Sequence, residues 1–139
     1  MALLVRASAE DAQGLTDAEL HDQLVTLVAA GHETTATAMA WSMLELARHP
    51  AIQERCVAEI AGGGDLPYLD AVLKESLRLH PVVPMVMREL QEPTTVGGRT
   101  YPRGVTLSPS IVLAHRDSAA YPSPGEFDPG PARARGIRQ

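Results

Sequence analysis

A long run without proline, residues 17–48, most constrains what this chain can fold into. It follows Thr16-Asp17-Ala18-Glu19, a capping box in which the threonine hydroxyl and the glutamate carboxylate satisfy backbone N–H groups at a helix start. Pro50 ends the run, and Arg48 lies in the last turn, where the helix dipole favours a cation. The sequence therefore predicts a helix over about 17–48, ~48 Å long. Because this is longer than a chain of 139 residues needs, it indicates a bundle that spans something larger.

Composition narrows the class of protein. The length suits one domain, and 45% hydrophobic residues are enough for a core. A net charge of −5 and a total of only five Trp, Tyr and Phe residues argue against a nucleic-acid binder. We find no apolar run of 18 residues and no signal-peptide pattern, so we expect no membrane segment and a cytoplasmic location. The single cysteine, Cys56, excludes an internal disulfide and a multi-cysteine metal site.

Two further helices are predicted before Pro81. The first covers about 50–61 and ends at the glycine run 62–64. The second covers about 67–80 and begins after Asp65, which we expect to cap it. The apolar stripe of this second helix is Leu69, Val72, Leu73, Ser76, Leu77 and His80.

After Pro81 the sequence pattern changes from helical to one of short strands and turns. A hairpin is predicted over about 94–107, turning at Gly97-Gly98, and residues 111–114 are compatible with either a helix or a strand. The fold class expected from these patterns is mainly α with a small antiparallel β-sheet, that is α+β.

The middle of the long helix carries a polar step, Ala30-Gly31-His32-Glu33-Thr34-Thr35, between apolar flanks. One reading is a small-ligand or water site on a locally widened helix. The other reading, equally weighted on the residues alone, is a solvent-facing polar step. A zinc-protease site is rejected, because the second histidine of that motif is replaced by Ala36.

Glu75 and Arg78 lie three residues apart on the predicted helix over 67–80. Taken alone, this spacing is typical of an exposed ion pair worth a few tenths of a kcal/mol. Periodicity places the pair on the face away from the leucines, which favours the surface reading.

The motifs in their order resemble the cytochrome P-450 family of heme-thiolate monooxygenases over about residues 10–129. The resemblance rests on Ala30–Thr35, Glu75-Ser76-Leu77-Arg78-Leu79-His80-Pro81, Arg88, His115-Arg116-Asp117 and the segment from Tyr121 to Pro129. It implies a partial P-450 domain over 1–129 with a long central helix, the Glu-x-x-Arg helix, the hairpin and a meander over about 115–129. Residues 130–139 are then a divergent arginine-rich tail.

The resemblance also implies roles for single residues. Glu33 and Thr34 match the catalytic acid–alcohol pair that conducts protons to iron-bound dioxygen. Glu75 and Arg78 match a structural ion pair that a meander arginine normally completes. The remaining matches are heme-contacting positions Ala30, Gly31, Thr35 and Arg88, the last pairing with a propionate, and substrate-pocket positions Val83 and Val86.

For the intact family, the resemblance implies heme b as cofactor and insertion of one oxygen atom of O2 into a small organic substrate. Electrons come from an electron-transfer partner, a ferredoxin or flavoprotein. No nucleic-acid partner is implied.

The chain departs from the family after Pro129, where no ligand cysteine follows. Cys56 is expected to be a small buried apolar group and not the iron ligand. We therefore expect a fragment from a truncated or frameshifted reading frame, inactive by itself and without stable heme binding. The alternative function is a non-catalytic helical remnant or a partner-binding module.

Overall fold

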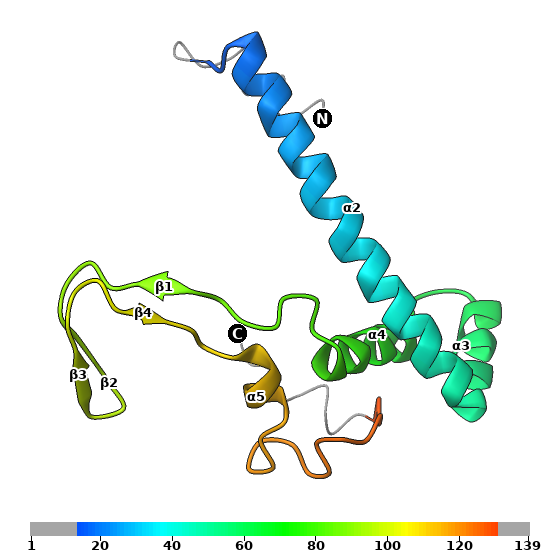
Figure 1. Cartoon of the computed structure of the whole chain (residues 1–139). Coiled ribbons are helices and arrows are strands. Elements are labelled where there is room, and N and C mark those ends of the chain that lie inside the picture. Colours follow the sequence, from blue (N-terminus) through cyan, green and yellow to red (C-terminus); the bar gives the residue numbers. More distant parts are fainter. Residues whose placement is uncertain (1–13, 131–139) are drawn as a thin grey trace. The chain divides into compact units, whose positions relative to one another are not determined.

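The computed structural model describes residues 14–130, which are mainly helical with short antiparallel strands (Figure 1). These residues divide into two compact units, one ending at Thr37 and the other beginning at Ala38. The boundary falls within helix α2, Asp17–Arg48, so that its first part belongs to one unit and its last turns to the other. The fold class predicted from the sequence is confirmed.

Helix α2 begins at the capping box. The backbone N–H of Thr16 donates to Glu19 Oε2 at 2.9 Å, and the N–H of Glu19 donates to Thr16 Oγ1 at 3.3 Å. These bonds stabilise the ionised carboxylate and lower the pKa of Glu19, the backbone bond having the larger effect. The helix ends before Pro50, the first residue of α3.

Helices α3, Pro50–Gly62, and α4, Pro67–Leu79, pack against each other. The expected cap at Asp65 is wrong, since the residue preceding α4 is Leu66 and its side chain makes no capping bond. Glu59 of α3 takes that role, because its two carboxylate oxygens accept from the backbone N–H groups of Tyr68 and Leu69, each at 2.8 Å. The cap thus comes from the neighbouring helix.

The predicted apolar stripe of α4 is partly wrong. Val72 and Ser76 are buried, but Leu73 and Leu77 are at least 40% exposed. The buried face of α4 holds Val72, Glu75, Ser76, Arg78 and Leu79. The helix is therefore rotated so that its polar Glu75–Arg78 pair, and not Leu73 or Leu77, faces the interior.

The strands form two separate two-stranded antiparallel sheets. Strand β1, Arg88–Glu89, pairs with β4, Thr106–Leu107, and strand β2, Thr94–Val96, pairs with β3, Arg99–Tyr101. Gly97 and Gly98 turn the β2–β3 hairpin with φ of 59° and 77°, a region that side chains disfavour. The predicted hairpin over 94–107 thus holds one hairpin and one strand of the other sheet.

The segment after β4 forms a short helix, α5, Ile111–His115. Ser110 begins it, since its side chain accepts from the N–H of Leu113 at 3.2 Å. Among residues 14–130, no helix is both long and apolar enough to cross a membrane.

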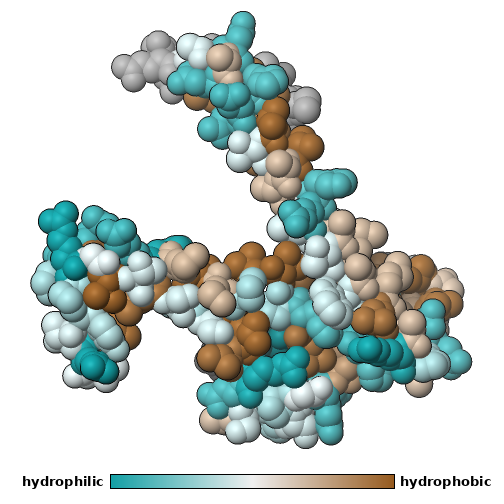
Figure 2. Space-filling view, in the orientation of Figure 1, coloured by the Kyte–Doolittle hydropathy of each residue, from teal (hydrophilic) through white to brown (hydrophobic). Residues whose placement is uncertain are grey.

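Apolar side chains lie on the surface of α2 (Figure 2). In its first unit, Val25, Leu27 and Val28 are all more than half exposed. In the second unit, Met39 and Met43 of the same helix are also more than half exposed. Helix α2 therefore leaves much apolar surface uncovered by the described residues of its own units.

Candidate functional site

Glu75 and Arg78 form a buried ion pair at the centre of the second unit. They are 4% and 3% exposed, so the surface ion pair expected from their spacing is wrong. Arg78 Nε donates to Glu75 Oε2 at 2.7 Å, and Arg78 Nη2 donates to Glu75 Oε1 at 2.8 Å. This two-pronged geometry matches the planar guanidinium to the planar carboxylate and requires arginine in place of lysine.

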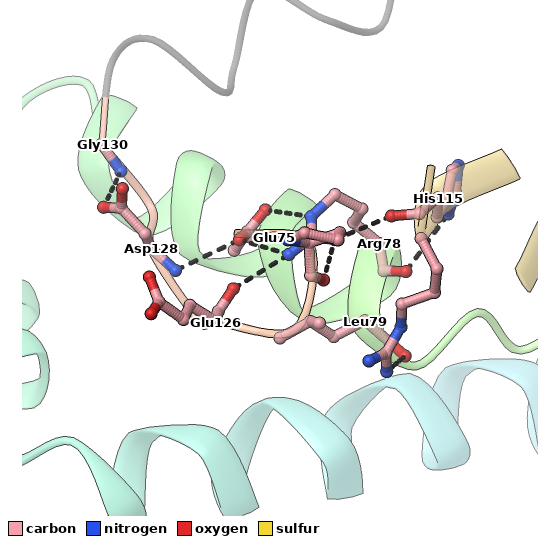
Figure 3. Close-up of polar contacts among 9 residues, drawn as sticks. Glu75, Arg78, Leu79, His115, Glu126, Asp128 and Gly130 are labelled. Carbon is pink, nitrogen blue, oxygen red and sulfur yellow. Dashed lines mark hydrogen bonds and ion pairs between the residues drawn. The ribbon is translucent and has the colours of Figure 1, made fainter. Parts of the chain in front are cut away.

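The other donors of Arg78 bind the segment that follows α5. Nη1 donates to the carbonyl oxygens of His115 at 2.9 Å and Pro124 at 2.8 Å, and Nη2 donates to that of Glu126 at 3.0 Å. Figure 3 shows the contacts of Arg78 with His115 and Glu126. All five N–H groups of the guanidinium thus have acceptors. One buried side chain therefore holds a stretch of irregular backbone against α4.

Two further hydrogen bonds join the segment after α5 to α4. The N–H of Asp128 donates to Glu75 Oε1 at 3.1 Å, and Arg116 Nη2 donates to the carbonyl of Leu79 at 3.2 Å (Figure 3). The second bond satisfies a carbonyl at the end of α4 that has no partner within the helix. Tyr121 is buried with its ring 5.1 Å from the Arg78 guanidinium, within cation–π range. Residues 115–128 are therefore fixed by polar contacts to α4.

A second polar cluster, which sequence reasoning missed, joins α2 to the end of α4. His80 Nε2 lies 2.8 Å from Oε1 of Glu45, a carboxylate only 4% exposed. The rings of His80 and Trp41 stack at 4.1 Å, only 3° from parallel. The local signals that the sequence offers are Arg48 and His49, which follow Glu45 by three and four residues.

This cluster borders an open cavity of about 580 Å³. Its walls come from α2, the end of α4 and the segment 116–128. They are rich in charge and poor in apolar side chains, and include Glu45, Arg48, His80, Arg116, Glu126 and Asp128.

The polar step of α2 lies in the first unit and is exposed throughout residues 30–35. The Thr34 hydroxyl donates to the carbonyl of Ala30 at 2.6 Å, the bond that threonine commonly makes inside a helix. A Cβ added at Gly31 would meet no atom within 4 Å. Glu33 and Thr35 lie in the same turns with exposed side chains. The surface beside Gly31 is therefore open among the described residues, with a hydroxyl and a carboxylate close by in sequence.

The other positions singled out from the sequence lie in the second unit. Arg88 is exposed on β1, and its Nη1 donates to the carbonyl of Met87 at 2.9 Å. Val83 is exposed and Val86 is half-buried, just before that strand. Neither Val83 nor Val86 belongs to the buried core around α4.

The described residues do not supply an axial thiolate for iron. Cys56 is 3% exposed within α3. Burial raises the pKa of its thiol, as does the nearby Glu59 carboxylate, while Arg55 acts in the opposite direction. A raised pKa keeps the thiol protonated, whereas a metal ligand must be deprotonated. Among residues 14–130, no three His, Cys, Asp or Glu side chains are grouped so that they could hold a metal ion.

Comparison with known proteins identifies the family. The family model for cytochrome P450 matches residues 1–131, so the chain belongs to the cytochrome P450 family. Members of this family are heme-dependent monooxygenases, a class of oxidoreductase.

Among its relatives, cytochrome P450 135B1 of Mycobacterium bovis is 46% identical over 134 residues, covering 93% of this chain and 28% of that protein. Cytochrome P450 4A24 of Sus scrofa is 41% identical, over 91% of this chain and 28% of that protein. The solved structure of retinoic acid-bound cyanobacterial CYP120A1 matches with a TM-score of 0.81 and 37% identity, over 91% of this chain and 31% of that one. This chain therefore spans less than a third of the length of these relatives.

Proposed function

We propose that this chain supplies the oxygen-activating helix and the Glu-x-x-Arg helix of a heme-dependent monooxygenase. The reaction inserts one oxygen atom of O2 into an organic substrate and draws electrons from an electron-transfer partner. The observation that carries the proposal is the family match over 1–131, which includes both the polar step of α2 and the buried Glu75–Arg78 pair.

Within this proposal, Thr34 and Glu33 handle protons. The Thr34 hydroxyl, bonded to the Ala30 carbonyl at 2.6 Å, presents an oxygen that can accept one proton while it passes on another. The exposed Glu33 carboxylate is the titratable group that resupplies it. The small residues Ala30 and Gly31 leave space beside the hydroxyl, which fits the close approach of a flat cofactor and a diatomic molecule.

Arg88, Val83 and Val86 have binding roles in the proposal. The exposed Arg88 guanidinium donates to the neighbouring Met87 carbonyl within the described residues and is able to pair with a propionate. Val83 and Val86 would border the substrate, and Thr35 would contact the cofactor. The Glu75–Arg78 pair has a structural role in the proposal, because Arg78 holds residues 115–128 against α4.

When bound, heme supplies the oxidising chemistry. Since the buried Cys56 thiol does not fit an axial ligand, we expect that this chain alone does not hold heme stably and is inactive.

A transplant tests the proposal. Residues 16–129 of this chain replace the matching stretch of the Mycobacterium bovis relative, which is 46% identical. We expect the chimera to give the long-wavelength carbon monoxide band of a heme thiolate after reduction. In the same chimera, Thr34→Ala is expected to keep that band and to lose the coupling of electron consumption to oxygenation by about tenfold or more. The matched control is Thr26→Ala, which removes an exposed threonine hydroxyl bonded four residues back on the same helix.

Two results would count against the proposal. One is a folded chimera without the heme-thiolate band. The other is a Thr34→Ala chimera that couples electrons to product as well as the Thr26→Ala control does. For the chain alone, a thiolate band with added heme that disappears in Cys56→Ser would show that Cys56 is a ligand after all.

A further inference from the structure

The link between α2 and α4 depends on one buried carboxylate. Glu45 is 4% exposed, and burial of an ionised carboxylate is costly unless it is paired. Its nearest partner is His80 Nε2, at 2.8 Å, whereas Arg48 Nη1 is 3.6 Å away on a side chain that is 60% exposed. His80 is therefore the partner that matters most to Glu45.

The charges around this pair are nearly balanced without the histidines. Lining the same cavity are three carboxylates, two guanidinium groups and two imidazoles: Glu45, Glu126, Asp128, Arg48, Arg116, His49 and His80. His49 is engaged differently, since its Nδ1 lies 2.8 Å from the Glu45 carbonyl and 3.5 Å from Glu45 Oε2, and its ring tilts against Phe127. The protonation of His80 therefore decides whether the carboxylate has a full cationic partner from α4.

We propose that Glu45, His80 and Trp41 form a proton-controlled latch that tightens the contact between the last turns of α2 and the end of α4. With one proton on its ring, at Nε2, the neutral imidazole of His80 donates a hydrogen bond to the Glu45 carboxylate. With two protons, it forms an ion pair at the same 2.8 Å, which is the stronger interaction. The latch requires neither heme nor the rest of a P450, so it stands apart from the proposed function.

The direction of the effect follows from the charges. Histidine is the side chain whose charge ordinarily changes between about pH 5 and pH 8. A second proton on His80 adds a positive charge 2.8 Å from the buried carboxylate and tightens the latch. The α2–α4 contact is therefore expected to be firmer when His80 carries two protons than when it carries one.

Trp41 reports the state of the latch. It is the single tryptophan of the chain, and its ring stacks on His80 at 4.1 Å. A doubly protonated imidazole is a cation on the indole face and quenches indole fluorescence more strongly than a neutral ring. Emission from the chain therefore follows the second proton on His80.

The experiment measures the emission of the full 139-residue chain from about pH 8.5 to about pH 5, with far-ultraviolet circular dichroism to check that each variant keeps its helices. We expect emission to fall in one transition. His80→Gln removes that transition, and the matched control His49→Gln keeps it. Glu45→Gln replaces the carboxylate partner of the imidazole and is expected to change the transition. A transition that survives His80→Gln, or one that Glu45→Gln leaves unchanged, overturns the proposal.

A second measurement addresses stability directly. Amide hydrogen exchange in the last turns of α2 is expected to be slower near pH 6 than near pH 8 after correction for the intrinsic rate, and to lose that difference in His80→Gln. An equal pH dependence in the parent and in His80→Gln would mean that His80 does not act as the latch.

Discussion

The bond between Glu59 and the start of α4 gives a sharp test of how this chain positions its Glu-x-x-Arg helix. The Glu59 carboxylate accepts from the N–H groups of Tyr68 and Leu69, at 2.8 Å each. Loss of a helix cap costs about 0.5–2 kcal/mol, and loss of a negative charge at a helix N-terminus costs about 0.3–1 kcal/mol. Glu59→Ala is therefore expected to destabilise the start of α4 by about 1–3 kcal/mol.

Hydrogen exchange at the Tyr68 and Leu69 amides is the direct assay. We expect both to exchange about 5- to 160-fold faster in Glu59→Ala, which is the range that about 1–3 kcal/mol gives. Glu59→Gln keeps one acceptor oxygen but places an amide donor against the other N–H, so we expect it to protect only one of the two amides. Glu54→Ala, an exposed carboxylate on the same helix, is the control. If the two alanine variants exchange at the same rate, the capping argument is refuted.

Three other predictions concern the second unit and α2. Arg78→Lys leaves three N–H donors in place of five and is expected to destabilise the second unit by roughly 3 kcal/mol or more, measured by urea unfolding against the surface control Arg103→Lys. Gly98→Ala forces a side chain to a φ of 77° and is expected to cost about 1 kcal/mol; an unchanged unfolding midpoint would contradict it. The exposed apolar side chains of α2 predict that the isolated chain binds a hydrophobic dye or self-associates, whereas a sharp monomeric melt without dye binding would favour a partner-binding module.

The sequence was sufficient to predict those structural features that depend on residues close together in the chain. Thr16, Glu19 and Pro50 mark the ends of α2, and the structure has that helix at Asp17–Arg48. The two adjacent glycines of the β2–β3 turn reveal the hairpin, because positive φ is a property of the residue itself. These features depend on neighbours only a few residues away, which a sequence pattern displays directly.

Contacts between distant residues gave no such signal. Arg78 can be buried because the carbonyls of His115, Pro124 and Glu126 accept its hydrogen bonds. Since every residue has a backbone carbonyl, the sequence does not show which carbonyls will meet Arg78. The spacing of Glu75 and Arg78 alone therefore indicated a surface pair. The cap from Glu59 was missed for a related reason, since its acceptor oxygens come from another helix. Strand β1 has two residues and exists only through its pairing with β4.

The candidate functional residues also differ in how far contacts within this chain account for them. Neither Thr34 nor Glu33 has a distinctive environment in this structure, because both are exposed on α2. Their proposed roles depend on family membership and on groups that would lie beside them in a longer protein. The Glu75–Arg78 pair is different, since its buried geometry is complete within the second unit and accounts for why arginine is needed at that position. A guanidinium supplies five donors in one plane, which is what a carboxylate and three carbonyls of an irregular segment require. The geometry of the Glu75–Arg78 pair is therefore complete within the second unit, whereas the proton-handling role proposed for Glu33 and Thr34 depends on groups beyond the described residues.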